Sequence, residues 1–220
     1  MRPEEIAASL RRAVRERLIV PGQVINQDEL ARRYGVSRIP LREALRTLVG
    51  EGLVIMKPGL GAIVTELDGA EVDELYGLRL QLEPPLAEAI VDRVARRDVT
   101  ELRGMVERLA DLDEADSPDW FSAHYAFNRR LYELSGRRHA LRLVVQVLNL
   151  VEPYARMHSH MAGARRDLAR RCGEIAEAVA DGDAELLRER IETGLRISRE
   201  SLVAALADAV SDAENEAVPG

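Results

Sequence analysis

Hydrophobic residues recur every three or four positions along most of this chain, which is the spacing that places them on one face of an α-helix. In the first such segment the stripe consists of Ile6, Leu10, Val14, Arg17 and Leu18. The pattern predicts a helix over residues 3–20, and Pro21-Gly22 follows it as a stop signal.

A helix-turn-helix pattern comes next. Residues 26–29 form an Asn-Gln-Asp-Glu capping box, which begins a short helix that ends near Tyr34. Gly35 then provides a tight turn, and Ser37 is placed to cap a second helix. The inward face of that helix is predicted from three leucines at helical spacing, Leu41, Leu45 and Leu48.

Arginines occupy the other face of the second helix. Arg38, Arg42 and Arg46 recur at every fourth position, and Pro40 lies in the first turn, where its missing N–H costs little. A helix with leucines behind and arginines in front suits the DNA major groove, where arginine most often contacts guanine. A solvated arginine face without a partner is the alternative that the same spacing allows.

After a linker at residues 66–68, all remaining segments have helical patterns, which predicts a helical bundle. The tail over residues 211–220 is acidic and lacks aromatic residues, so we expect it to be disordered. The predicted helices run from Asp68 to a break at Pro84-Pro85, from Asp98 to about Asp111, from Ser117 to about Gly136, from Arg138 to about Tyr154, from Arg165 to Ala180, and from Ala184 to about Ala209.

The charge of the chain is distributed unevenly. Its 220 residues include 31 Lys and Arg and 38 Asp and Glu, which gives a net charge of −7. Residues 1–66 contain 11 basic and 8 acidic side chains, or +3, so the remainder carries −10. This asymmetry places a nucleic-acid surface in the N-terminal part, although a charge of +3 alone also arises by chance.

Composition and motifs exclude several classes of protein. The single cysteine rules out a disulfide framework and fits a reducing cytoplasm. No apolar run approaches the ~20 residues of a membrane span, and the N-terminus lacks the apolar core of a signal peptide. We therefore expect a cytoplasmic protein without membrane contact. We also expect no enzymatic activity, because the chain lacks a Gly-rich phosphate loop and a nucleophile–base pair at useful spacing.

Short motifs in the N-terminal part occur in the order and at the spacing of a known family. The chain resembles the GntR family of bacterial transcription regulators, which implies a winged helix-turn-helix. The strands of the wing would be residues 53–56 and 62–65, with the tip at residues 57–61. The matching motifs are Pro21-Gly22, Glu29-Leu30-Ala31, Gly35-Val36-Ser37-Arg38, Pro40, Arg42-Glu43-Ala44-Leu45, Leu48, Glu51-Gly52-Leu53, Gly59 and Gly61. The candidate DNA-binding residues are therefore Ser37, Arg38, Pro40, Arg42, Arg46, Lys57, Gly59 and Gly61.

Looser motifs in the second part resemble the FCD effector-binding domain of the FadR-like branch of the same family. This resemblance implies a homodimer whose helical domain binds a small molecule, commonly an organic acid. The expected organisation is a DNA-binding domain over residues 1–66, an FCD-like domain over residues 67–210 and the tail. The motifs are Leu75-x-x-x-Arg79-x-x-Leu82-Glu83-Pro84, Phe127-x-x-x-Leu131, Ile175-x-x-Ala178 and Gly182-Asp183.

Most FCD domains hold a divalent metal through an Asp and three His, and this chain departs from that pattern. By the family's motif the four positions are His124, Asn128, Cys172 and Gly194. The resemblance therefore implies a pocket without the usual ion, formed by His124, Asn128 and Cys172, with Arg79 meeting an effector carboxylate. We expect neither a metal nor another cofactor.

Simpler roles for these residues remain open. Arg79 could make an internal ion pair, and His124 could be an ordinary, partly buried histidine. Cys172 could be a small buried hydrophobe, or it could join His124 in a weak zinc site completed by water.

Together these features predict a sequence-specific DNA-binding transcription regulator, a homodimer on a pseudo-palindromic operator. We expect a repressor that is released by an organic acid or a more apolar metabolite. The alternatives are a dimeric DNA-binding protein that responds to no ligand and, less favoured, a metal-dependent enzyme on the bundle. The sequence leaves open the effector, the operator, the regulated genes and the choice between repression and activation.

Overall fold

The computed structural model describes residues 1–158 and 163–216, and these are mainly α-helical, as predicted. The chain divides into two compact units. One contains Met1–Leu67 and Asn149–Pro153, and the other contains Asp68–Leu148 and Tyr154–Gly220. None of the described helices combines the length and the apolar character that crossing a membrane requires.

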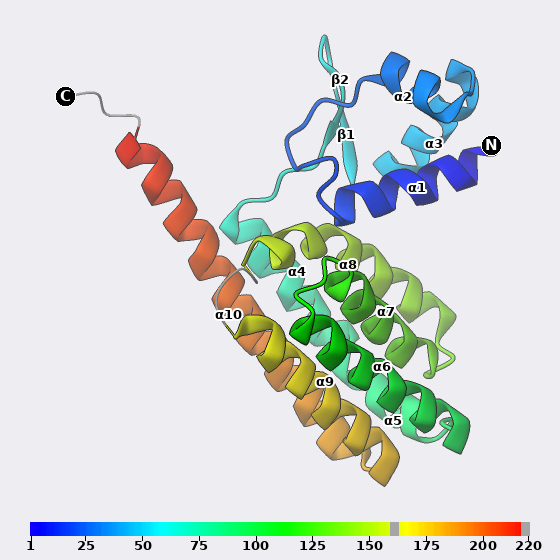
Figure 1. The fold of residues 1–220 in the computed structure, drawn as a ribbon, viewed down its shortest axis with the longest axis vertical. Helices are drawn as coiled ribbons and strands as arrows, with labels where there is room; N and C mark the ends of the chain where they lie inside the picture. Colours follow the sequence, from blue (N-terminus) through cyan, green and yellow to red (C-terminus); the bar gives the residue numbers. More distant parts are fainter. Residues whose placement is uncertain (159–162, 217–220) are drawn as a thin grey trace. The chain divides into compact units, whose positions relative to one another are not determined.

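The N-terminal unit is a winged helix-turn-helix. Its two strands form an antiparallel hairpin in which Val54 pairs with Val64 and Lys57 pairs with Gly61. Val24 adds an isolated bridge to Ile63. Figure 1 shows the hairpin beside the three helices of this unit. The elements are α1 (Pro3–Arg15), α2 (Gln27–Tyr34), α3 (Arg38–Gly50), β1 (Val54–Lys57) and β2 (Gly61–Val64).

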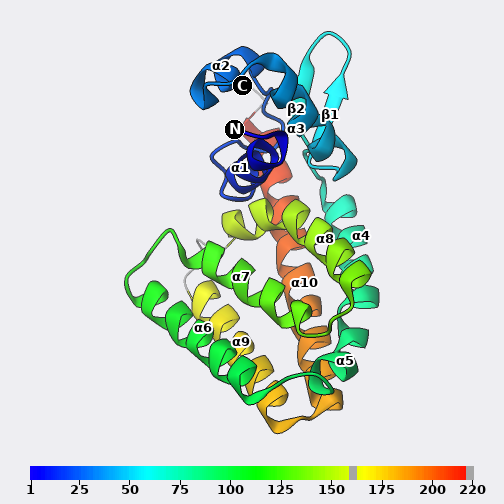
Figure 2. The same ribbon diagram turned by 90° about the vertical axis from the view of Figure 1, so that its right-hand side faces the viewer.

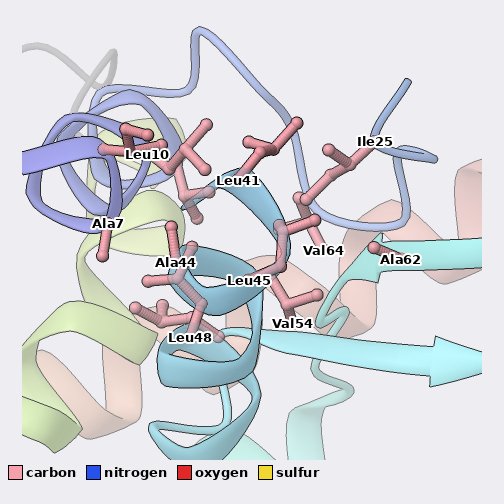
Figure 3. Close-up of a cluster of buried hydrophobic side chains, with 13 residues drawn as sticks. Ala7, Leu10, Ile25, Leu41, Ala44, Leu45, Leu48, Val54, Ala62 and Val64 are labelled. Carbon is pink, nitrogen blue, oxygen red and sulfur yellow. The ribbon is translucent and has the colours of Figure 1, made fainter. Parts of the chain in front are cut away.

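The leucine stripe of α3 forms the centre of this unit. Leu41 and Leu48 are completely buried, and Leu10 of α1 packs in the same cluster. Figure 3 shows α3 directing its apolar side chains toward α1 on one side and toward the hairpin on the other. Fully burying a leucine contributes roughly 1.5–3 kcal/mol, so this stripe fixes which face of α3 points away from the core.

The turn between α2 and α3 follows from local chemistry. The Asn26 side chain accepts a hydrogen bond from the backbone N–H of Glu29 over 3.1 Å and so caps α2. Gly35 ends α2 in the left-handed region, at φ 63°, where a side chain would be strained. Ser37 occupies the N-cap position of α3, but its hydroxyl makes no capping hydrogen bond.

The second unit is helical throughout its described residues. Asp68 and Glu71 form the capping box that begins α4, and α4 ends before the two prolines, as predicted. The elements are α4 (Gly69–Leu82), the short 3-10 helix η1 (Pro84–Leu86), α5 (Ala87–Val91), α6 (Arg96–Glu114), α7 (Trp120–Glu133), α8 (Arg138–His158), α9 (Ala164–Asp181) and α10 (Ala184–Glu216).

The interior of the helical unit is formed by pairs of neighbouring helices. Helix α10 packs along α4, and α6 packs against both α7 and α9. Figure 2 shows α6 and α9 running side by side. Trp120 and Phe127 of α7 are completely buried in this interior, together with Leu102 of α6.

The two largest differences from the predicted boundaries lie at the ends of α1 and α10. Helix α1 ends at Arg15 rather than at residue 20, because Arg17 adopts φ 56° and turns the chain before the proline is reached. Helix α10 continues to Glu216, so residues 211–216 of the expected disordered tail are helical. No glycine or proline interrupts that segment, and its alanine and glutamate residues favour a helix. Residues 217–220 lie outside the described residues.

Candidate DNA interface and effector site

The exposed face of α3 carries the three predicted arginines. Arg38, Arg42 and Arg46 are all exposed. Nη2 of Arg38 lies 2.7 Å from a carboxylate oxygen of Asp28, and Nη1 of Arg46 lies 2.8 Å from one of Glu43. Arg42 makes no ion pair with any residue in the described part of the chain. It is therefore the arginine of the three whose guanidinium is already free to bind another group.

The N-terminus of α3 is open to solvent. Ser37 is exposed in an extended conformation, and Pro40 is partly buried in the first turn. The first N–H groups of a helix have no partner within the helix, and together with the helix dipole they favour an anion. Ser37 and the first turn of α3 are thus suited to binding an anion such as a phosphate, and Arg42 lies further along the same helix.

The wing tip is built from glycines in unusual backbone conformations. Gly59 has φ 79° and Gly61 has φ 87°, which other residues rarely adopt. The backbone N–H of Leu60 donates to the carbonyl of Lys57 over 3.2 Å, so the tip closes as a tight turn. Lys57 is exposed beside this turn, and its ammonium can contact a phosphate as a point charge.

In the helical unit, Arg79 is held in a buried network. Its Nε lies 2.6 Å and its Nη2 3.1 Å from the two carboxylate oxygens of Glu83, one helical turn away. The hydroxyl of Tyr132 donates to Glu83 over 2.5 Å. Burial by itself lowers the pKa of Arg79, but the interactions with Glu83, Tyr76 and Tyr132 together outweigh it and raise that pKa. The internal ion pair, one of the two roles open for Arg79, is therefore present.

His124 and Asn128 contact each other on one face of α7. The Asn128 amide nitrogen donates to the backbone carbonyl of His124 over 3.0 Å and lies 3.2 Å from its Nε2. In this orientation of the amide, Nε2 accepts and the ring proton is on Nδ1. The ring stacks on Trp120 with centroids 5.2 Å apart. The lone pair that a metal would use is thus directed at an amide hydrogen.

The environment keeps His124 neutral. Burial, together with the positive charges of Arg79 and Arg171, lowers its pKa from 6.5 to about 3. A neutral imidazole beside two guanidinium groups favours an anionic or hydrogen-bonding ligand over a cation.

The other two positions of the family's metal site do not supply a ligand set. Cys172 is buried, and burial raises the pKa of its thiol to about 12, so it is protonated near neutral pH. Gly194 has no side chain, and the place of its missing Cβ lies 3.9 Å from Cδ of Arg171. Among the described residues, no three His, Cys, Asp or Glu side chains lie close enough together to hold a metal ion. The residues therefore do not fit the usual ion.

Sequence reasoning missed three residues of this interior. Glu83 was part of a family motif, and its spacing of four from Arg79 was the signal for an ion pair. Tyr132 has no such local signal, because it lies on a different helix. The indole N–H of Trp120 is buried and has no acceptor among the described residues, so it is a hydrogen-bond donor without a partner.

Comparison with known families covers nearly all of the chain. Residues 3–64 match the family described as bacterial regulatory proteins, gntR family, and residues 74–196 match the FCD domain. A helix-turn-helix transcriptional regulator from an unstable DNA locus of Streptomyces ambofaciens is 31% identical over 192 residues, covering 87% of this chain and 81% of that protein. The gluconate operon transcriptional repressor of Bacillus licheniformis is 34% identical over 97 residues, 44% of this chain and 38% of that protein.

Solved structures share the fold at low sequence identity. Escherichia coli McbR/YncC superimposes with a TM-score of 0.82 at 20% identity, covering 94% of this chain and 98% of that one. A transcriptional regulator of the GntR class from Rhodococcus sp. RHA1 gives a TM-score of 0.77 at 21% identity, with 92% and 98% covered. These similarities support the two-domain fold described above.

Proposed function

Because the chain belongs to the GntR family of transcription regulators and carries an FCD domain, we propose that it is a repressor released from its operator by a small molecule. The observation that carries the DNA-binding part is the face of α3. Its arginines Arg38, Arg42 and Arg46 are exposed, while the leucines behind them are buried. Such a helix can enter the major groove and read bases with its N-terminal half.

The effector is proposed to bind in the helical unit beside α7. The neutral His124, the amide of Asn128 and the unpartnered indole N–H of Trp120 are polar groups that lie close together on α7. A few convergent polar groups among apolar side chains are typical of a small-molecule site. Arg171 supplies a positive charge near His124, which favours an organic acid or a related anion.

The proposed site works without a metal. Asn128 already uses the Nε2 lone pair of His124, and the thiol of Cys172 is protonated. Metal analysis of protein purified without chelator or metal-affinity resin tests this point. One equivalent of zinc, nickel or manganese per chain, lost in a His124→Ala variant, would overturn it.

One observation favours a regulator that responds to no ligand. Arg79, the side chain expected to meet an effector carboxylate, is already paired with Glu83 through two hydrogen bonds. In this alternative the helical unit serves only to join two chains. The proposal requires Arg79 to act indirectly, by holding α4 and α7 together through Tyr132.

Operator selection followed by a ligand titration separates these functions. The full-length protein is used to enrich duplexes from a random pool, and the enriched operator is then titrated with small organic acids and apolar metabolites. Release by one compound, lost in Trp120→Phe but retained in an Arg129→Ala control, supports the proposal. Stable binding in the presence of every compound supports the ligand-independent regulator, and failure to enrich any sequence contradicts both.

A further inference from the structure

Ile39 is an apolar side chain exposed on the face of α3 proposed to meet DNA. This residue is 74% exposed. This is the highest value among the large hydrophobic residues whose side chains the structure describes. Leu41, two positions later, is completely buried. Scattered exposed hydrophobics are normal, so the exposure matters only because of where Ile39 lies.

The position of Ile39 on the helix is opposite the buried stripe. Two residues correspond to about 200° of rotation, so Ile39 points away from the side on which Leu41 enters the core. Arg42 and Glu43 follow it by three and four residues and share its face. Ile39 therefore lies within one turn of the arginine that has no ion-pair partner in the described part of the chain.

Neither folding nor helix formation explains the isoleucine. It is not among the partly buried residues that pack against the core cluster of the N-terminal unit, which include Leu30 and Val36. A β-branched residue is also slightly unfavourable in a helix. A polar or unbranched side chain would serve the fold at least as well at this position.

The chemistry of the major groove offers a partner for it. The C5-methyl of thymine is the apolar group that base pairs present there, whereas the other edges carry hydrogen-bond donors and acceptors. Arginines around Ile39 attract the phosphates on either side of such a base. A protein partner would have to cover the same arginines, and their positive charge favours the polyanion.

We infer that Ile39 is a specificity-determining residue that recognises a thymine through its C5-methyl group. The thymine lies next to the base contacted by Arg42 in each half of the operator. This inference rests on the proposed function, because it requires α3 to enter the major groove. It goes further in naming a base and the side chain that selects it.

Replacing thymine by uracil tests the contact, because uracil lacks only that methyl group. Thymines of the selected operator are replaced one at a time in both half-sites, and binding is titrated with the unchanged protein, Ile39→Ala and Val49→Ala. Val49 is an exposed β-branched residue in the last turn of the same helix, so it serves as the matched control. Burial of one methyl is worth about fourfold in affinity, so replacement in both half-sites should weaken binding about sixteenfold.

The expected result is a uracil effect at one thymine per half-site that disappears in Ile39→Ala and persists in Val49→Ala. The inference is overturned if no thymine responds, or if Ile39→Ala retains the effect at every responsive thymine. Equal melting temperatures of the variants exclude a folding defect. If no operator is enriched, the proposed function fails together with this inference, whereas an operator without the methyl effect removes only the inference.

Discussion

At the scale of single residues, the arginines of α3 differ in their ion-pair partners. Arg38 and Arg46 have carboxylate partners at the surface, which the proposed contact with DNA would displace. Exposed ion pairs of this kind contribute little to stability, so the displacement costs little. Arg42 has no such partner in the described part of the chain and is the best candidate for direct contact with a base.

We predict that Arg42→Ala weakens operator binding by about 1–3 kcal/mol and reduces discrimination against a scrambled duplex. Lys57→Ala should instead weaken binding to both duplexes alike and lower the salt slope by about one. Fluorescence anisotropy titrations on both duplexes at several salt concentrations distinguish the two. If Arg42→Ala binds the operator as tightly as the unchanged protein does, α3 does not read bases.

The buried network of Arg79 makes a second prediction. Glu83→Leu leaves a buried guanidinium without its carboxylate, which should destabilise the helical unit by about 3–5 kcal/mol. The double variant Arg79→Met with Glu83→Leu should recover most of that loss, because no charge is left unpaired. Trp120 is the single tryptophan of the chain, so its fluorescence in urea unfolding reports on this unit.

The exposed pair of Arg103 and Glu177 provides the control for this experiment. Glu177→Leu should change the unfolding midpoint little, because both side chains are already solvated. A small effect of Glu83→Leu, comparable to that of Glu177→Leu, would mean that the buried network does not stabilise the fold.

His124 predicts a pH dependence of stability. Its pKa is about 3 in the folded protein and 6.5 when unperturbed, so the unfolded chain binds a proton that the folded chain does not. The free energy of unfolding should therefore fall as the pH drops below 6.5, by at most about 1.4 kcal/mol per pH unit. Urea unfolding between about pH 6.5 and 5 measures this slope, because carboxylates usually titrate below that pH range. The slope of the unfolding free energy against pH should flatten in His124→Gln and stay unchanged in His139→Gln, since His139 is exposed.

At the scale of elements, the hairpin depends on backbone conformations that only glycine adopts easily. Gly61→Ala places a side chain at φ 87°, which costs about 1–2 kcal/mol although nothing obstructs the new Cβ. We predict that the wing loosens and that affinity falls for all DNA sequences alike. Gly50→Ala is the matched control, because Gly50 is helical and its Cβ would also meet open space. Equal binding by both variants would exclude a contribution of the wing.

At the scale of the whole molecule, one recognition helix reads too few base pairs for a specific operator. We propose that a homodimer of the 24.5 kDa chain places two such helices on a pseudo-palindrome. We predict a dimer in sedimentation at micromolar concentration. Inserting about five base pairs between the half-sites should abolish binding, because it turns one half-site to the opposite face of the duplex. A monomer that binds its operator one to one would contradict this arrangement.

The sequence alone determined the elements of the N-terminal unit. The Asn26 cap, the turn at Gly35 and the leucine stripe all depend on residues a few positions apart, so periodicity and short motifs reveal them. The two-stranded wing was implied by the resemblance to the GntR family, and the structure contains it. The break of α4 before the prolines was predictable for the same reason. The family followed from the order of these motifs, which its match over residues 3–64 confirms.

Tertiary structure decided which side chains of neighbouring helices contact each other and which of them are buried. Spacing allowed Arg79 to pair with Glu83, but only the packing of α7 brings Tyr132 to the same carboxylate and buries all three. The end of α1 at Arg15 depends on a backbone turn at Arg17 that no glycine or proline announces. The neutral state of His124 likewise results from burial and from the charges of Arg79 and Arg171 on other helices. Such effects join residues far apart in the sequence, and their sign depends on which groups the fold removes from water.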